Sequence, residues 1–423
     1  MSLDLDRVVI VGGSLAGFTA AATLRGEGWD GDLIVVEASA TMPADRPPLS
    51  KQVLAGTTSP ADAVSALTAR IDGLDVDVRL DHRVAGAGFA ADDLRLKFFN
   101  DHEITADAII VATGSAPRWP SGFLVETEES TANEPKFRPS LTGVHVVRDL
   151  PDAEALKADL DAGPQRLVVI GAGFIGAEVA ATARAAGIDV TIVEFAPLPL
   201  ARVFGGLVGE FIAQLHRDEG VDLRLGVGLD QIVGGADGRV AGVTLTDGSA
   251  LDCDLLVLGL GAAPDLEWAI GSGLTIDNGV VCDDTLSAGP GVVAAGDVAN
   301  WHNPLFGERM RVEHWENAIE QGEAAAKRLL AARDDVPGVP FASVPWFWSD
   351  QYDVKIQMAG RPAADDEIVL IDGDPAERRF AVAFRRGDRC TGVFAANRPR
   401  IAVVARMRMR ESLDWSHVVP TAS

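Results

Sequence analysis

The sequence has few cysteines. Only three occur among 423 residues, at positions 253, 282 and 390, and no two of them form a Cys-x-x-Cys pair. This spacing does not suit a disulfide framework or a zinc site, and it fits a reducing compartment. We therefore expect a cytoplasmic protein without a metal centre.

Basic residues are also scarce. Lysine and arginine number 37 against 62 aspartates and glutamates, which gives a formal net charge of −25. Nucleic acids and anionic lipid surfaces both attract basic proteins. Neither a nucleic acid nor a membrane is therefore an expected partner.

Long apolar runs are missing as well. No run approaches the ~18 residues of a membrane span. Residues 1–11 lack a basic segment followed by an apolar stretch, so no signal peptide is expected. Hydrophobic residues still make up 47% of the chain, and its length corresponds to about three domains of ~150 residues.

Two segments about 160 residues apart share one pattern. Each has a buried strand, a glycine turn, a helix and a second strand, which predicts a Rossmann-type βαβ unit. In the first these elements are 8–11, 12–17, 18–24 and 33–36; in the second they are 167–170, 171–176, 177–186 and 190–193.

The rest of the chain predicts further strands and a third unit. Strands are expected at 109–112, 255–258 and 292–295, and a helix at 316–332. After residue 336, short strands (354–358, 368–371, 380–384, 391–395) and a helix near 401–411 indicate a β-rich domain. The predicted fold class is α/β, with two Rossmann-type dinucleotide-binding domains and a C-terminal α+β domain.

Residues 119–141 differ from their surroundings. They contain four glutamates and three prolines, which predicts a long exposed loop or a partly disordered insertion. Such an insertion could shade a ligand cleft, or it could be a surface loop without a function.

The second glycine turn has the spacing of a phosphate-binding cradle. Gly171 makes the turn, Gly173 lets a pyrophosphate approach, and Gly176 lets the helix pack on the strand. The helix N-terminus then directs N–H groups at the phosphates. Glu194 ends the next strand, where a carboxylate would bind an adenosine ribose. The alternative is a glycine turn without a ligand.

The first glycine turn repeats this device with a serine in the middle. Gly12, Ser14 and Gly17 form the turn, and Glu37 ends the strand 20 residues after Gly17. Serine is small enough for the middle position, and the glutamate strengthens the interpretation. A turn without a ligand is again the alternative.

Glu194 also predicts which nicotinamide cofactor binds. A 2′-phosphate about 4 Å from a carboxylate would cost up to ~4 kcal/mol at an effective dielectric near 20. The next residues, Phe195 and Ala196, bring no positive charge. We therefore expect NADH to be preferred over NADPH.

Six further stretches stand out as motifs. They are Arg46-Pro47-Pro48-Leu49-Ser50-Lys51, Ala112-Thr113-Gly114, Gly173-Phe174-Ile175-Gly176-Ala177-Glu178, Ala295-Gly296-Asp297, Arg311-Val312-Glu313-His314-Trp315-Glu316-Asn317-Ala318 and Phe347-Trp348-Ser349-Asp350-Gln351. Together they resemble one family, the putidaredoxin-reductase-like FAD enzymes, which are NADH-dependent ferredoxin reductases of oxygenase systems. The matches follow in order from residue 8 to about 400.

The resemblance implies that the first cradle holds FAD and the second NADH. It implies an FAD-binding domain of residues 1–118 and 252–333, an NAD-binding domain of 119–251 with the insertion at 119–141, and a C-terminal domain of 334–423. Residues expected to bind FAD are Gly12, Ser14, Gly17, Glu37, Arg46, Lys51, Thr113, Gly114, Gly296, Asp297, Glu313, His314 and Trp315.

The resemblance also implies the catalytic residues. Lys51 and Glu178 would flank the place where nicotinamide meets flavin, and Trp315 would lie beside the isoalloxazine. Hydride transfer requires stacked rings and little water. Each residue has a simpler interpretation: Lys51 as a solvated charge, Trp315 as a core aromatic and Glu178 as a helix carboxylate.

The cysteine positions limit where the electrons can go. Residues 38–51 contain no cysteine, unlike flavin disulfide reductases, so we expect buried inert thiols and electron transfer to an external acceptor. The resemblance implies that NADH reduces FAD, which then passes single electrons to a [2Fe–2S] ferredoxin serving a monooxygenase or dioxygenase.

Residues 378–410 are unusually basic. They contain ten arginines and a single acid, Asp388. Bacterial ferredoxins are typically acidic, so this segment is a candidate docking surface; ordinary surface charge is the alternative.

Two other functions remain open. A membrane-associated NADH:quinone reductase would use residues 401–413 as an amphipathic anchor. An NADH-responsive flavoprotein redox sensor would use the same two cradles.

Overall fold

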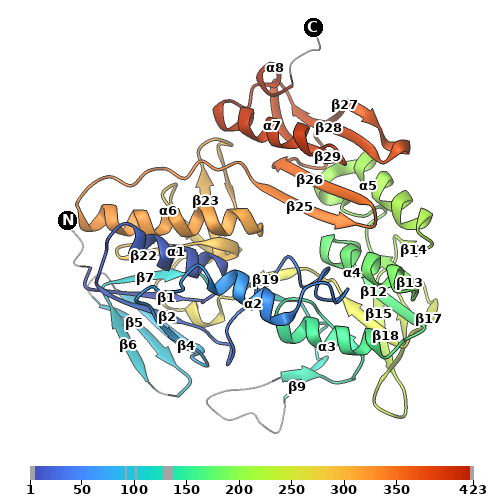
Figure 1. Ribbon diagram of the computed structural model, residues 1–423, viewed down its shortest axis with the longest axis horizontal. Coiled ribbons are helices and arrows are strands. Elements are labelled where there is room, and N and C mark those ends of the chain that lie inside the picture. Colours follow the sequence, from blue (N-terminus) through green and yellow to red (C-terminus); the bar gives the residue numbers. More distant parts are fainter. Residues whose placement is uncertain (1–4, 91–92, 101, 127–136, 420–423) are drawn as a thin grey trace.

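The computed structural model describes residues 5–90, 93–100, 102–126 and 137–419. Within these residues lie two mainly parallel sheets, several small sheets and an antiparallel C-terminal sheet, with helices packed around them (Figure 1). This arrangement confirms the predicted α/β fold class.

The first parallel sheet contains the first glycine turn. Its strand order is β21 (Ser287–Gly289), β22 (Val292–Ala294), β7 (Ala108–Val111), β1 (Arg7–Val11), β2 (Asp32–Val36) and β3 (Asp77–Arg79). Only β21 runs antiparallel to its neighbour. Its central strands are apolar on both faces, as parallel strands covered on both sides require.

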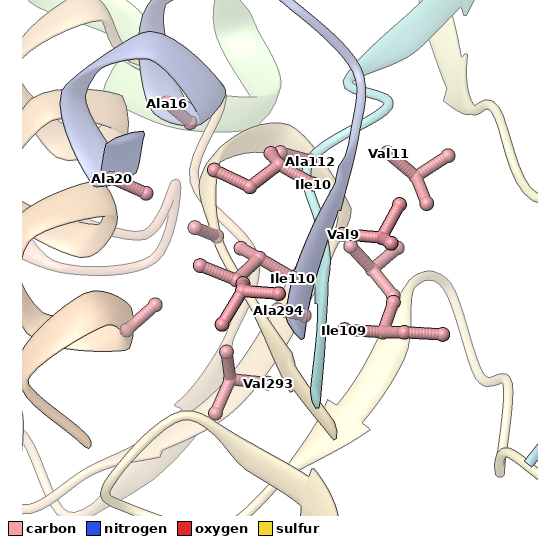
Figure 2. Packing of buried hydrophobic residues seen from close by; sticks show 14 of the residues in the cluster. Val9, Ile10, Val11, Ala16, Ala20, Ile109, Ile110, Ala112, Val293 and Ala294 are labelled. Atoms are coloured by element: carbon pink, nitrogen blue, oxygen red, sulfur yellow. The ribbon is translucent and has the colours of Figure 1, made fainter. Parts of the chain in front are cut away.

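Helices cover one face of this sheet. In Figure 2, Ile10 and Ile110 point towards Ala16 and Ala20 of helix α1 (Leu15–Gly26), whereas Val9 and Ile109 point to the opposite face. Helix α6 (Trp315–Arg333) packs closely on α1, since a Cβ at Gly322 would lie 2.5 Å from the Ala16 carbonyl oxygen. Helix α2 (Pro60–Thr68) lies nearby (Figure 1).

The second parallel sheet contains the second glycine turn. Its order is β11 (Val144–His145), β18 (Leu255–Leu258), β12 (Arg166–Ile170), β13 (Asp189–Glu194) and β14 (Asp222–Leu225). Helices α3 (Leu150–Asp161), α4 (Phe174–Ala185) and α5 (Ala201–Asp218) contact its strands.

One predicted domain boundary is too early. Strand β18 pairs with β12 inside the second sheet, so a boundary between residues 251 and 252 would cut that sheet. The chain returns towards the first unit after residue 258, where β19 (Ala262–Pro264) pairs with β8 (Ser115–Pro117). Sequence periodicity recognised β18 as a buried strand but could not assign it to a sheet.

Three smaller sheets are attached to the two units, and the sequence analysis did not predict them. Their strands are β4 (Val84–Ala90), β5 (Asp93–Phe98) and β6 (Glu103–Ala106); β15 (Leu229–Gly234), β16 (Val240–Leu245) and β17 (Ala250–Asp252); and β20 (Val280–Cys282), β23 (Ala299–Asn303) and β24 (Glu308–Met310). These strands pair antiparallel except for β20 and β23, which are parallel. Short 3₁₀ helices lie at Glu267–Ala269, Gly296–Val298 and Pro375–Glu377.

The expected loop at 119–141 contains a pair of strands. Strand β9 (Leu124–Glu126) pairs antiparallel with β10 (Phe137–Pro139). Residues 127–136, on which the prediction of disorder mainly rested, lie outside the described residues.

The C-terminal unit is an antiparallel sheet with one face covered by a helix. Its order is β25 (Trp346–Gln351), β26 (Val354–Gly360), β29 (Arg389–Ala396), β28 (Arg379–Arg386) and β27 (Glu367–Asp374). Helix α7 (Pro399–Glu411) buries Ala402, Ala405 and Met409, and α8 (Trp415–Val418) follows.

This packing bears on the membrane-anchor interpretation. Ala402, Ala405 and Met409 of α7 belong to a core shared with the sheet, whereas Val403 and Met407 of the same helix are exposed. Among the described residues, no helix is long and apolar enough to cross a membrane.

Candidate functional site

A cavity of about 420 Å³ lies where the three units meet. Both glycine turns reach it, through Ser14 and Leu15 of the first and Gly173 to Gly176 of the second. The C-terminal unit contributes Phe347 and Trp348. Predicted site residues that line the cavity are Ser14, Arg46, Lys51, Gly173, Gly176, Glu178, Asp297, Glu313, His314 and Trp315.

The first and last glycines of each turn are required by close backbone contacts. A Cβ at Gly12 would lie 2.3 Å from the Ala112 carbonyl oxygen, and one at Gly17 would lie 2.0 Å from the oxygen of Gly12 itself. The second turn repeats this, with a Cβ at Gly176 only 2.3 Å from the Gly171 oxygen. These positions therefore serve the packing of helix on strand.

The middle position of each turn has a different character. A Cβ at Gly173 would meet no heavy atom of the described residues within 4 Å. Ser14 caps α1 without a side-chain hydrogen bond to that helix. Protein packing therefore does not explain a small residue here, whereas a ligand approaching the helix N-terminus does.

Glu37 and Glu194 make matching contacts. Glu37 accepts hydrogen bonds from the backbone N–H of Gly13 (2.8 Å) and of Ser39 (2.9 Å). Glu194 accepts from Ala172 (2.8 Å) and Ala196 (2.8 Å). Each carboxylate is held beside its own glycine turn and keeps acceptor capacity for the hydroxyls of a ribose.

Two arginines meet beside Asp297. Arg148 donates to Asp297 Oδ2 (3.0 Å), which also accepts from Ser115 (2.8 Å). Arg46 lies close to Arg148, and both guanidinium groups are beside Gly114. A Cβ built at Gly114 would lie 3.1 Å from Arg148 Nη2 and 3.5 Å from Arg46 Nη1.

The charges at this point suit an anionic ligand. Lost hydration, together with the neighbouring Arg148, lowers the pKa of Arg46 to about 10. Burial would raise the pKa of Asp297, but both arginines outweigh burial and lower it. Arg148 Nε is buried without a hydrogen-bond partner among the described residues. Two guanidinium groups near one carboxylate leave donors for phosphate or other oxyanions.

Lys51 and Glu178 form an ion pair in the cavity wall. Lys51 Nζ lies 3.2 Å from Glu178 Oε1 and 3.8 Å from Asp350 Oδ2, and the Lys51 side chain is 11% exposed. Lys51 is therefore not the solvated charge of the simpler interpretation. Glu178 is 4% exposed, so it is not an ordinary surface carboxylate of a helix.

Trp315 and His314 begin helix α6 at the edge of the cavity. The Trp315 indole N–H donates to Asp45 Oδ1 (2.7 Å), and its ring meets Trp348 edge-on, with centroids 5.8 Å apart. Trp315 is thus a partly buried wall residue. Lost hydration lowers the pKa of His314 to about 4, so its imidazole is neutral near pH 7. Its Nδ1 has no partner among the described residues.

Thr113, Gly114 and Gly296 do not line the cavity, and their contacts are with other parts of the protein. Thr113 donates to the Asp265 carbonyl oxygen (2.7 Å), and Gly114 has a positive φ of 75°. The N–H of Gly296 donates to Gln321 of α6 (2.8 Å). Glu313 pairs with Arg311.

The three cysteines do not form a disulfide. Cys253, Cys282 and Cys390 are free and buried, and burial raises the pKa of each thiol to about 12. The expectation of buried thiols is confirmed.

The basic segment 378–410 is less basic in the fold than in the sequence. Within the described residues, carboxylates pair with Arg378, Arg385, Arg386, Arg398, Arg406 and Arg410. Several of these acids come from distant elements: Glu219 follows α5, and Glu316 and Glu320 lie on α6. The ten arginines therefore do not form one uncompensated patch.

Sequence reasoning missed several residues of the site. Arg148 contacts Asp297, Asp45 contacts Trp315, and Ser50 and Ser349 contact Glu178. Only Ser50 and Ser349 stood in recognised motifs, and without an expected role. A signal for Arg148 was present in the capping box of Asp149 and Asp152, which predicts a helix start directly after it.

Two protein-family models match the chain. The pyridine nucleotide-disulphide oxidoreductase model matches residues 6–322, and the reductase C-terminal model matches residues 346–417. The first model covers both parallel sheets, and the second covers the antiparallel C-terminal sheet.

Individual proteins match over nearly the whole chain. Rhodocoxin reductase from Rhodococcus erythropolis is 36% identical over 406 residues, covering 94% of this chain and 88% of the relative. The ferredoxin–NAD(+) reductase component of the anthranilate 1,2-dioxygenase system from Burkholderia cepacia is 34% identical over 408 residues, covering 96% and 94%. Among solved structures, the covalent putidaredoxin reductase–putidaredoxin complex matches with a TM-score of 0.85 at 32% identity, covering 98% of this chain and 96% of that chain.

Proposed function

The chain belongs to the pyridine nucleotide-disulphide oxidoreductase family, and we propose that it is an FAD-dependent NADH:ferredoxin reductase of an oxygenase system. The observation that carries the proposal is that both glycine turns open on one cavity. Dinucleotides bound at the two turns would direct their rings into this shared space, as hydride transfer requires. Bound FAD supplies the chemistry that links a two-electron donor to one-electron acceptors.

We assign FAD to the first turn and NADH to the second. In the first unit, Gly12 and Gly17 shape the turn, Ser14 leaves room for the pyrophosphate, Glu37 binds the ribose, and Arg46, Arg148 and Asp297 hold the polar middle of the molecule. In the second, Gly171 and Gly176 shape the turn, Gly173 admits the NADH pyrophosphate, and Glu194 binds its ribose. With the boundary corrected, β18 belongs to the NADH-binding unit.

The chain's own residues then prepare the meeting place of the rings. The Lys51–Glu178 pair presents a fixed charge pair to the nicotinamide, and Trp315 and Trp348 restrict water at the cavity wall. The N-terminus of α6, directly after His314, directs backbone N–H groups to the cavity and stabilises negative charge there.

The electron acceptor is inferred from the names of the relatives and from the burial of the cysteine thiols. The rhodocoxin, anthranilate-dioxygenase and putidaredoxin reductases named above are all redox partners of other proteins. The cysteines are buried, so they are unsuited to accept electrons from the flavin within the protein. A [2Fe–2S] ferredoxin that feeds a monooxygenase or dioxygenase is the acceptor that fits. We place the protein in the cytoplasm, where NADH is available and thiols stay reduced.

The test is steady-state NADH oxidation with a panel of [2Fe–2S] ferredoxins and cytochrome c as the final acceptor. We expect at least one ferredoxin to accelerate cytochrome c reduction strongly. Rapid flavin reduction by NADH with no ferredoxin dependence across the panel would overturn the assignment of the acceptor but not that of the cofactors.

We further propose that ferredoxin docks on the residues of segment 378–410 that lack a carboxylate partner in the described chain. Arg379 and Arg400 are exposed members of this group, and they can attract an acidic ferredoxin. Arg386 is a poor probe, since its partner Asp366 has a side chain only 1% exposed, and breaking such a pair disrupts the fold.

Arg400→Glu tests the docking surface. We expect kcat/KM for ferredoxin to fall about fivefold at low ionic strength, with a weaker salt dependence and an unchanged rate with ferricyanide. Lys355→Glu is the matched control, because it makes the same charge change at an exposed position of the same unit outside the segment. Equal effects of the two substitutions would contradict docking at Arg400.

A further inference from the structure

Strand β25 carries the C-terminal unit to the wall of the cavity. Phe347 and Trp348 line the cavity, and the next residue, Ser349, is fully buried. Ser349 Oγ donates a hydrogen bond to Glu178 Oε1 at 2.7 Å, although the two residues are 171 positions apart in the chain.

Glu178 is thereby held from three sides. Ser50 of the first unit donates to its Oε2 (2.5 Å), Lys51 donates to Oε1 (3.2 Å), and Ser349 donates to the same Oε1 from the C-terminal unit. A carboxylate in a nearly closed site loses its water and needs replacement donors. These groups replace that water, and because they come from different units they also fix the position of the carboxylate.

Gln351 determines the direction in which the Ser349 hydroxyl points. Its amide Nε2 donates to Ser349 Oγ at 3.3 Å, and both side chains are fully buried. The two residues lie on the same face of β25, since side chains alternate along a strand. A serine hydroxyl has one proton, and with its acceptor side taken by Gln351 that proton is given to Glu178.

We propose that Ser349 is a positioning residue for hydride transfer, which acts through Glu178, and that the C-terminal unit thereby completes the nicotinamide site. Asp350 of the same strand approaches Lys51 from its other side at 3.8 Å, so β25 contacts both members of the ion pair. The inference rests on the proposed function, in which Lys51 and Glu178 flank the nicotinamide.

Ser349→Ala removes one of the three donors that hold the Glu178 carboxylate, so the carboxylate can shift. A displacement of about 1 Å in a catalytic group can cost ~100-fold in rate. Since Ser50 and Lys51 still hold the carboxylate, we expect a smaller loss, a fall of about tenfold in the limiting rate of flavin reduction. The Kd of NADH should change less than about threefold, because the adenosine half of NADH binds at Glu194.

The experiment is anaerobic stopped-flow reduction of the FAD-loaded protein over a range of NADH concentrations. Ser343→Ala is the matched control, because it removes a hydroxyl from the same unit that is 8% exposed and has no partner among the described residues. We expect this control to keep the wild-type limiting rate.

A double-mutant cycle separates positioning from general packing. If Ser349 acts through Glu178, then Ser349→Ala has no further effect on the limiting rate in a Glu178→Gln background. A tenfold loss in both backgrounds, or no loss in the wild-type background, would overturn the inference. Failure of the proposed function would look different, because NADH would then not reduce the flavin of the wild-type protein.

Discussion

Replacing Glu194 by glutamine tests how the second cradle chooses its dinucleotide. The Glu194 carboxylate accepts the backbone N–H groups of Ala172 and Ala196, both at 2.8 Å, and so stands at the end of β13 in the position of a ribose-binding group. A 2′-phosphate would enter the same space. At about 4 Å and an effective dielectric near 20, each unit of phosphate charge is repelled by ~4 kcal/mol, about a thousandfold in binding.

Water and salt reduce this repulsion, because the Glu194 side chain is only partly buried. We therefore expect the wild-type protein to prefer NADH over NADPH by about 100-fold in kcat/KM. In Glu194→Gln the charge is gone, and the preference should fall below about tenfold. Glutamine also keeps only one acceptor oxygen, so one backbone N–H loses its partner and the KM for NADH should rise several-fold.

The assay is the reduction of ferricyanide with either dinucleotide, which does not depend on a ferredoxin. Glu37→Gln is the matched control, because Glu37 makes the same pair of backbone contacts in the first cradle. Glu37→Gln should weaken the retention of FAD. In the FAD-loaded protein, the ratio of kcat/KM for NADH to kcat/KM for NADPH should stay unchanged. Comparable kcat/KM values in the wild type, or an unaltered ratio in Glu194→Gln, would refute the reasoning.

Two further predictions concern the glycine turns and acid stability. Gly176→Ala should destabilise the protein by about 3 kcal/mol, because the new Cβ would lie 2.3 Å from the Gly171 oxygen. Gly173→Ala should keep the wild-type melting temperature and raise the KM for NADH about tenfold. Equal melting temperatures for the two variants would contradict this prediction. Burial lowers the pKa of His216 to about 4, and a lowered histidine pKa means that stability is lost as the pH falls from about 6.5 towards 4. Between pH 7 and pH 5, urea unfolding should show that the wild type loses about 2 kcal/mol more than His216→Gln, and parallel losses would contradict this.

Local pattern was sufficient for the parts of this protein that are built from neighbouring residues. Each glycine turn, its flanking strand and helix, and the glutamate at the end of the next strand lie within about 30 residues, and backbone contacts between Gly12 and Gly17 enforce the spacing. The same holds for β18 and α6, whose periodicity was readable. Recognition of Lys51, Glu178 and Asp297 as site residues required the resemblance to a family.

Contacts between the units could not be predicted in this way. Arg148 and Asp297 are 149 positions apart, and Glu178 and Ser349 are 171 apart. No periodicity relates such pairs, because their meeting depends on how whole sheets and helices pack. The assignment of β18 to the second sheet also depended on pairing between distant strands.

The sequence by itself determined two dinucleotide cradles and the absence of a cysteine pair near the first, because both are properties of short segments. Only the tertiary structure shows that the cradles face one cavity, that five of the ten arginines of 378–410 pair with acids from outside that segment, and that the C-terminal unit holds Glu178. The physical reason is that charge and hydrogen bonding act over a few ångströms of space, whatever the separation along the chain.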